Sequence, residues 1–249
     1  MLVTMVKKKL MVPGGRTVGE FVLVVLGVLV ALMVDTWIDQ RNDDNLRQEY
    51  LSSLNDDLKT DLQNLEYHIS FFTSVYSFGL DTRDALRSDE PMNQDALLAA
   101  YYASENWNYA PVKNTYEDLQ STGNIHLFGD LDLRLSLAAY HTKATADEVK
   151  LPQTYREIVR GIIPMKIQAA IRKYCPTIDD SGMIPSGFPP CTLPNLTVQE
   201  VNDVFASIRA YPGIVEILTY HVSQVDVATY LYETQRLSVL DVLAKLEDE

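Results

Sequence analysis

The residue types that most often do chemistry are few and scattered in this chain. Its four histidines lie at His68, His126, His141 and His221. No pair of them, and no histidine with a glutamate, has the spacing that places two metal ligands on one face of a helix. Glycine-rich phosphate loops and the Gly-x-Ser-x-Gly nucleophile motif are both absent from the sequence. The sequence therefore predicts no catalytic residue, no metal site and no cofactor.

Acidic residues are numerous, and several occur in pairs. Asp56-Asp57 and Asp179-Asp180 lack the alternating ligand spacing of a calcium-binding loop. Solvated helix faces account for such pairs better than an ion site does. The formal charge of the whole chain is −13, and a field of that sign repels nucleic acid and anionic lipid surfaces. We therefore exclude nucleic acid as a partner.

The two cysteines could form a covalent crosslink. Cys175 and Cys191 lie at the two ends of a segment that contains four prolines, and we predict a proline-rich loop at residues 175–196. In an oxidising compartment we expect a disulfide between them, closing a loop of about 15 residues and contributing roughly 3 kcal/mol. The alternative is two free thiols or half of a metal site.

The element that must position the rest is an apolar stretch at residues 17–38. No side chain is polar from Phe21 to Val34, and about 20 apolar residues span the hydrocarbon layer as one helix. We predict an uncleaved transmembrane helix. The alternatives are a buried helix of a soluble protein and a cleaved signal peptide, for which Ala31-Leu32-Met33 is a poor cleavage site.

Two features of this helix suggest contacts. Gly27 and Ala31 form a small-xxx-small pair that would let another membrane helix approach closely. Trp37 is placed to anchor the far membrane interface. Glu20 lies at the near end, one turn after Arg16, and we expect an interfacial ion pair between them; the alternative is a role for Glu20 in proton or ion chemistry.

Charges on either side of the helix predict its orientation. Lys7, Lys8, Lys9 and Arg16 precede it, whereas Asp35 and Asp39 follow. The positive-inside rule places residues 1–16 in the cytoplasm as a short basic tail, with the lysines at the lipid headgroups. Residues 39–249 are then outside, in the periplasm of a bacterium, as one exported domain. Met1, Met5 and Met11 are alternative start sites, and the tail is too short for an output domain.

Helical periodicity dominates the exported part. Apolar residues recur in steps of three and four over residues 39–87, which predicts a stalk helix continuous with the transmembrane helix. Five charged residues are expected on the solvated face of that helix: Asp56, Asp57, Lys59, Asp61 and Glu66.

Capping signals place the shorter helices. Asn93 can cap a short helix, Asn114 begins a capping box whose helix Gly123 closes, and Thr197 begins a second capping box. A longer pattern from Asp130 is interrupted at Pro152 and Pro164 and ends near Tyr174. The last helix is predicted at 213–247. The fold class is thus all-α: a transmembrane helix continuing into a stalk, with an extramembrane helical bundle and one disulfide-closed, proline-rich loop.

Two aromatic residues lie in the loop before Asn114. Trp107 and Tyr109 stand next to Pro111, and they either form an exposed contact surface or close the top of a small core.

Several of these segments resemble a known family. Gly19-Glu20, the apolar helix, Asp35-Thr36-Trp37 and a charged helix with Glu49, Leu51, Leu54, Asp57 and Leu58 are similar to a family of uncharacterised bacterial single-span membrane proteins. The segment TYEDLQSTGNI, beginning at Thr115, resembles a second signature of that family. The resemblance covers the first half of the chain and implies a single-span, mostly helical exported protein with no assigned activity.

Three function classes fit these features. We favour a non-catalytic accessory subunit of a larger inner-membrane complex, such as a photosynthetic reaction-centre, light-harvesting or respiratory assembly. Its expected partners are other integral membrane proteins and the bilayer. The alternatives are a periplasmic ligand-sensing module that works with a separate transmitter, and a membrane-tethered enzyme whose site is assembled only in three dimensions.

Overall fold

Most of the described part of the chain is helical. A computed structural model describes residues 15–146, 151–175 and 191–248, and no strand occurs among them. The chain divides into two compact units, Met1–Tyr50 and Leu51–Glu249. The predicted tail, residues 1–16 with Lys7, Lys8 and Lys9, lies almost entirely outside the described residues. So does most of the predicted proline-rich loop.

The first helix passes through the boundary between the two units without interruption. Helix α1 runs from Gly15 to Arg87, 73 residues. It contains the apolar stretch and ends where the stalk helix was predicted to end. No proline lies between Gly15 and Arg87, so every backbone N–H after the first turn can donate within the helix.

The second unit is built from the C-terminal part of α1 and seven further α-helices among the described residues. Their bounds are α2 Gln94–Tyr102, α3 Asn114–Thr122, α4 Leu131–Ala146, α5 Thr154–Ile162, α6 Met165–Tyr174, α7 Val198–Arg209 and α8 Ile214–Asp248, with a short 3-10 helix η1 at Asn124–Leu127. The predicted C-terminal helix is observed as α8, and the breaks predicted at Pro152 and Pro164 separate α4, α5 and α6.

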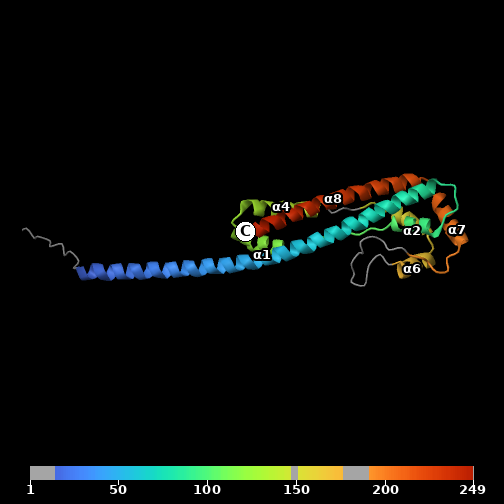
Figure 1. Cartoon of the computed structure of the whole chain (residues 1–249). Helices are drawn as coiled ribbons and strands as arrows, with labels where there is room; N and C mark the ends of the chain where they lie inside the picture. The colour runs from blue at the N-terminus through green and yellow to red at the C-terminus, as the bar shows by residue number, and fades with distance from the viewer. Residues whose placement is uncertain (1–14, 147–150, 176–190, 249) are drawn as a thin grey trace, which may run out of the picture. The chain divides into compact units, whose positions relative to one another are not determined.

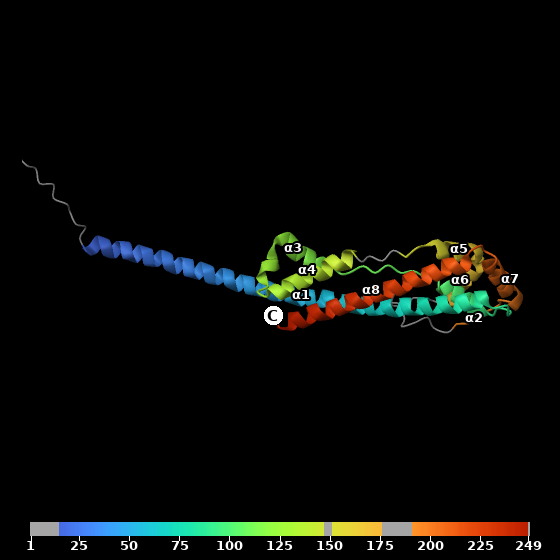
Figure 2. The ribbon, with the colours of Figure 1, turned by 90° about the horizontal axis from the view of Figure 1, so that it is seen from above.

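Helix α8 lies alongside the second half of α1 in both views of the ribbon (Figures 1 and 2). The ring of Phe72 on α1 lies 5.6 Å from that of Tyr232 on α8. A Cβ added to Gly79 would overlap the Cγ2 methyl of Val222. Between these two contacts the residue number rises from 72 to 79 on α1 and falls from 232 to 222 on α8. The two helices are therefore antiparallel.

A seven-residue repeat explains this pairing. Buried positions recur along α1 in alternating steps of four and three: Leu54, Leu58, Asp61, Leu65, His68, Phe72, Val75, Gly79, Thr82 and Leu86. Those of α8 do the same: Ile214, Leu218, His221, Val225, Ala228, Tyr232, Gln235, Val239 and Val242. A spacing of 3.5 residues keeps one stripe of each helix facing its partner, as in a coiled coil.

Short helices cover the long pair at its two ends. Helices α3 and α4 lie towards the C-terminal end of α8, and α2, α5, α6 and α7 towards the other end (Figure 2). The second group encloses a core that includes Tyr101, Tyr155, Ile171, Phe205 and Leu218. The Cys175–Cys191 disulfide, which the sequence predicted, adjoins this core.

The predicted caps are confirmed at two helices and wrong at a third. Asn93 accepts from the backbone N–H of Ala96, and Thr197 with Glu200 forms a complete capping box. Helix α3 instead starts after Lys113, which makes no side-chain cap. Gly123 does close α3, with φ 77° in the left-handed region that glycine adopts without strain.

Candidate functional site

The apolar part of α1 is the first candidate site. Among the described residues this helix alone is long and apolar enough to cross a membrane, and none of its most apolar window is buried within the chain. A core helix of a soluble protein would be covered on at least one face. The side chains of this stretch therefore have no apolar cover from the other described residues.

The predicted packing pair lies open on this helix. Gly27 and Ala31 are exposed and one turn apart, and no atom lies within 4 Å of a Cβ built on Gly27. A shallow hollow lies on the other face, lined by Leu29, Leu32, Met33, Thr36, Trp37 and Gln40. Another helix can thus approach the Gly27 face closely without displacing a side chain.

The predicted interface residues can be placed in part. Trp37 is exposed, and the guanidinium carbon of Arg41 lies 5.6 Å from its ring centroid, within the range of a cation–π contact. Glu20 is exposed. The side chains of Arg16, Lys7, Lys8 and Lys9 lie outside the described residues, so the Arg16–Glu20 pair stays a prediction.

The second unit contains a buried carboxylate that the sequence placed on the wrong face. Asp61 has no exposed surface, whereas it was expected among the solvated acids of the stalk. Its Oδ1 accepts from the backbone N–H of Val112 at 2.7 Å, and its Oδ2 accepts from the Tyr140 hydroxyl at 2.6 Å. The Tyr109 hydroxyl lies 3.2 Å from that of Tyr140. Asp61 therefore joins α1, α4 and the segment between α2 and α3.

Asp57, one turn before Asp61 on α1, also forms a hydrogen bond to the chain at the start of α3. Its Oδ2 accepts from the backbone N–H of Thr115 at 3.1 Å. The two carboxylates thus satisfy one backbone donor just before α3, at Val112, and one in the first turn of α3, at Thr115.

Burial perturbs the acid–base properties of this cluster. It raises the pKa of the Asp61 carboxyl, although hydrogen bonds from Tyr140, Val112 and Tyr109 act in the opposite direction. Burial and the neighbouring Asp61 also raise the pKa values of the Tyr109 and Tyr140 hydroxyls. Both tyrosines stay protonated and act as donors, which is what a positioning network requires.

The predicted contact surface at Trp107 and Tyr109 is wrong for Tyr109. This side chain is buried, and Trp107 is half-buried. Both rings make edge contacts with His68, at centroid distances of 6.2 Å for Trp107 and 5.5 Å for Tyr109. The alternative reading, that these aromatics close a core, fits the structure.

The histidines do not converge on one site. His126 is exposed, with Nδ1 2.7 Å from the carbonyl oxygen of Gly123. His141 stacks on Tyr116 with ring centroids 4.1 Å apart, and His221 Nε2 lies 2.9 Å from the Ala103 carbonyl oxygen. Among the described residues no group of three or more His, Cys, Asp or Glu side chains could hold a metal ion.

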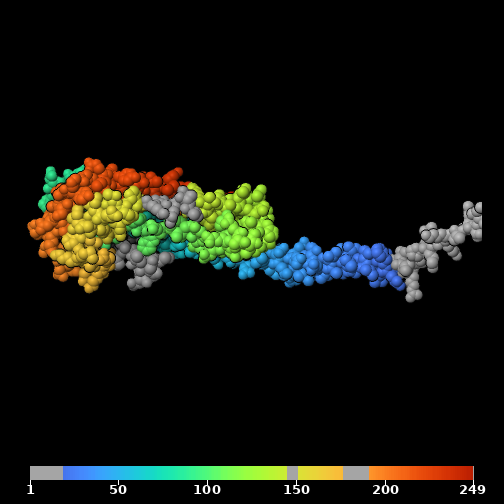
Figure 3. Space-filling model, turned by 180° about the vertical axis from the view of Figure 1, so that it is seen from behind, coloured from blue at the N-terminus to red at the C-terminus, as the bar shows by residue number. Residues whose placement is uncertain are grey.

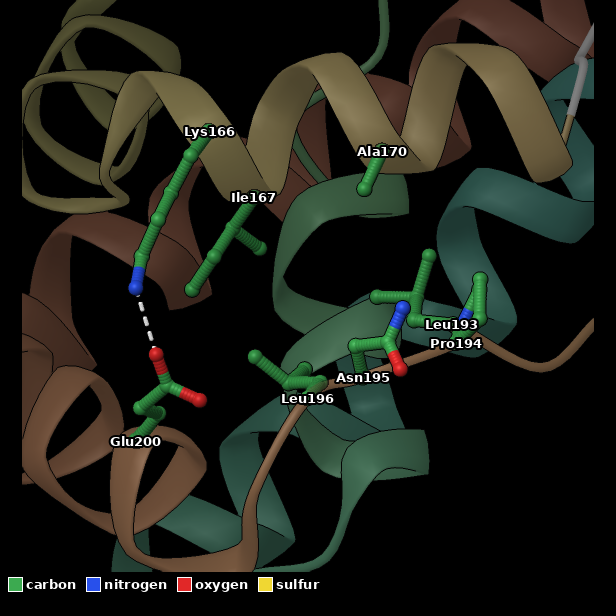
Figure 4. A pocket seen from close by; sticks show the side chains of 8 residues that line it. All are labelled: Lys166, Ile167, Ala170, Leu193, Pro194, Asn195, Leu196 and Glu200. Carbon is green, nitrogen blue, oxygen red and sulfur yellow. Dashed lines mark hydrogen bonds and ion pairs between the residues drawn. The ribbon is translucent and has the colours of Figure 1, made fainter.

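One hollow of the second unit is lined by polar and apolar groups together. It has a volume of about 180 Å³ and is lined by Lys166, Ile167, Ala170, Leu193, Pro194, Asn195, Leu196 and Glu200. Figure 4 shows the Lys166 side chain reaching from α6 to Glu200 at the start of α7, with Ile167 and Leu196 between the two elements. The ion pair and the capping hydrogen bonds from Thr197 lower the pKa of Glu200 to about 2. The two charged residues at the edge of this hollow, Lys166 and Glu200, are therefore paired with each other.

Comparison with known proteins identifies the family of this chain. The model of a family of unknown function, DUF6090, matches residues 20–147, just over half of the chain. The chain belongs to the DUF6090 family. No curated protein and no solved structure matches the chain.

The DUF6090 match contains most of α1 together with α2, α3 and α4, and ends before α8. The resemblance predicted for the first half of the chain is therefore confirmed as membership of an uncharacterised family. Asp61, Tyr109 and Tyr140 all lie inside the matched range. The position of Asp61 in the repeat of α1 was a readable signal, because Asp61 lies between Leu58 and Leu65 at the steps of three and four that a buried face requires.

Proposed function

We propose that this DUF6090 protein is a non-catalytic accessory subunit of a larger bacterial inner-membrane complex. Its N-terminus lies in the cytoplasm, one helix crosses the membrane, and the second unit lies in the periplasm. Its partners are other integral membrane proteins, and a photosynthetic reaction-centre, light-harvesting or respiratory assembly is the kind of host we favour.

One observation carries this proposal: the most apolar window of α1 is entirely uncovered by the rest of the chain. Lipid can cover such a helix, and the open Gly27–Ala31 face adds a place where a second helix packs at short distance. The Cys175–Cys191 disulfide supports the periplasmic location, since such bonds persist in oxidising compartments.

Native purification in a mild detergent tests the subunit role. We expect the untagged protein to migrate in a complex of fixed stoichiometry, identified by mass spectrometry. Gly27→Leu should lower co-purification because its side chain fills the close-approach face, whereas Val25→Leu adds bulk on the opposite face and should not. Recovery of the protein alone, or equal recovery of the complex with both variants, would count against the proposal.

Protease protection tests the orientation. In spheroplasts, an added protease should digest the second unit while the inner membrane stays intact. Protection of this unit until the membrane is lysed would reverse the proposed topology.

Ligand sensing is the second candidate function, and the hollow between α6 and α7 favours it. Its apolar lining and adjacent ion pair suit a small amphipathic molecule. A library of such molecules should raise the melting temperature in a concentration-dependent way, and Ala170→Phe, which fills the hollow, should abolish the increase. No stabilising compound, or stabilisation that survives Ala170→Phe, would remove this candidate.

A further inference from the structure

Helix α8 carries a second apolar stripe, on the face that points away from α1. Tyr220, Val227, Tyr230 and Leu237 are 57%, 50%, 67% and 60% exposed. Their spacing of seven, three and seven residues is that of a coiled-coil seam. We call these four residues the outer seam. At 1.5 Å per residue it extends over roughly 25 Å.

The outer seam is opposite the buried repeat of the same helix. The buried stripe passes through Leu218, Val225 and Tyr232, which lie about half a turn from Tyr220, Val227 and Tyr230 in helical projection. Figure 3 shows α8 atoms, orange to red, at the surface along the upper edge of this unit. A helix with apolar stripes on both sides is typical of one that packs between two partners, and the described residues cover only one side.

The charges next to the outer seam are of one sign. The exposed residues of α8 include Glu216, Asp226, Glu233, Asp241, Glu247 and Asp248, and none of them is basic. The basic side chains Arg236 and Lys245 are only partly exposed. Lys245 is already bound to Asp132 at 2.8 Å and to Asp241 at 2.9 Å. The face therefore presents an apolar seam with an uncompensated acidic edge at Asp226 and Glu233.

A second copy of this chain does not complement that edge. Two antiparallel α8 helices would bring one acidic edge against the other. Two parallel helices would place Asp226 opposite Leu231, and Glu233 opposite Ser238, by the pairing rule of a coiled coil. Neither arrangement gives Asp226 or Glu233 an opposite charge, and anionic lipid would be repelled.

We propose that the outer seam binds a helix from a different protein, one that carries lysine or arginine beside its own apolar heptad positions. This inference rests on the proposed role as an accessory subunit, and it names the chemistry of the periplasmic contact. The apolar seam supplies buried area, and the ion pairs with Asp226 and Glu233 select the partner and its register.

Two synthetic helical peptides test the proposal. Both are about four heptads long with leucine at the two apolar positions, and they differ only in lysine or glutamate at the flanking positions. The full chain in nanodiscs of zwitterionic lipid is titrated against each labelled peptide, with fluorescence anisotropy as the readout. We expect the lysine peptide to bind at least about tenfold more tightly than the glutamate peptide.

Variants make the test specific. The double variant Asp226→Lys, Glu233→Lys should reverse the preference between the peptides, and Tyr230→Ser with Leu237→Ser should weaken both by about tenfold or more. Glu66→Lys on α1 and Leu135→Ser on α4 change exposed residues elsewhere and should leave the affinities unchanged. Circular dichroism checks that each variant is folded.

Three results would overturn the proposal: equal binding of the two peptides, unchanged binding by the seam variant, or self-association of the chain that Leu237→Ser abolishes. The last result would assign the seam to a second copy. A result that contradicts the outer-seam proposal can be distinguished from one that contradicts the proposed function. If the native complex is lost with Gly27→Leu but peptide binding fails, the subunit role stands and the docking surface on α8 does not.

Discussion

At the scale of single residues, the Asp61 carboxylate is the group on which the segment between α2 and α3 depends. It binds a backbone N–H at one end of this segment and, through Tyr140, helix α4. A buried carboxylate is costly unless hydrogen bonds satisfy it. Asp61 therefore contributes only as long as its donors remain in place.

Asp61→Asn should destabilise the second unit. The amide offers one acceptor oxygen where the carboxylate uses two, so Val112 N–H and the Tyr140 hydroxyl can no longer both donate to this side chain. We expect a loss of about 1–3 kcal/mol in the free energy of unfolding, measured by denaturant titration of the full chain in detergent. The exposed neighbour Asp56→Asn is the control and should change little; equal effects of both variants would show that the network contributes nothing.

Gln235 should have the opposite effect. It occupies a buried position of the α8 repeat, and neither atom of its side-chain amide has a hydrogen-bond partner among the described residues. Gln235→Met keeps the size and removes the unsatisfied amide, so we expect a gain of about 1–2 kcal/mol in the same titration. A loss of stability would mean that the amide is satisfied by an internal water molecule.

Three buried histidines predict the response of stability to acid. Burial lowers the pKa of His68 and His221, and burial with the nearby Lys113 charge lowers that of His141 to about 4. In the window from about 6.5 down to about 4 the unfolded chain binds more protons than the folded one. Stability should therefore fall as the pH falls through that window.

Asp61 contributes with the opposite sign. Its raised pKa means that the folded state binds the proton more readily than the unfolded state just above pH 3.8. Melting temperatures measured from pH 8 to pH 4 should nevertheless decrease, since three histidines oppose one carboxyl. His141→Gln should make the curve flatter, and the exposed His126→Gln should not.

At the scale of elements, the antiparallel pair of α1 and α8 is the scaffold to which the short helices attach. They approach each other closely at Gly79, where Val222 occupies the space that a side chain would need. Packing of this kind tolerates little added volume.

Gly79→Ala should separate the helices locally. Overpacking at such a contact costs about 1–3 kcal/mol. Adding Val222→Ala should restore part of the loss, because it removes the methyl groups that the new Cβ meets. Gly161→Ala in α5 is the control: no atom lies within 4 Å of its added Cβ, so it should be neutral or slightly stabilising. Purely additive effects of Gly79→Ala and Val222→Ala would contradict the contact.

At the scale of the whole molecule, the family match and the folding unit do not coincide. The DUF6090 match ends at residue 147, whereas α8 begins at Ile214 and supplies the partner stripe for α1. Without α8, the buried repeat of α1 from Leu54 to Leu86 would lose the helix that lies alongside it. The matched segment therefore lacks a helix that contributes ten buried residues to the second unit.

A chain shortened to residues 1–147 should not form the native second unit as a monomer. We expect non-cooperative unfolding and fast amide exchange between residues 51 and 87, measured in the same detergent as the full chain. Adding a peptide of residues 213–248 should restore exchange protection on α1. Cooperative unfolding of the shortened chain alone would show that α8 is dispensable.

The sequence alone determined the class of the protein. The uninterrupted apolar run, the periodicity of the stalk, the prolines at helix breaks and the disulfide are local or compositional signals, and the all-α fold with one membrane-type helix follows from them. Periodicity also predicted the stalk helix over residues 39–87, because a helix face is a property of one segment.

Only the tertiary structure decided which polar residues are buried. Asp61 is acidic and was assigned to the solvated face. Hydrogen bonds from donors about 50 and 80 residues away in the chain offset the free-energy cost of burying its carboxylate. Tyr109 could be a surface aromatic or a core residue until His68 and Tyr140 were placed beside it. The outer seam of α8 likewise became visible only once α1 was seen to cover the opposite face, because a single helix does not specify which of two apolar stripes its own chain will bury.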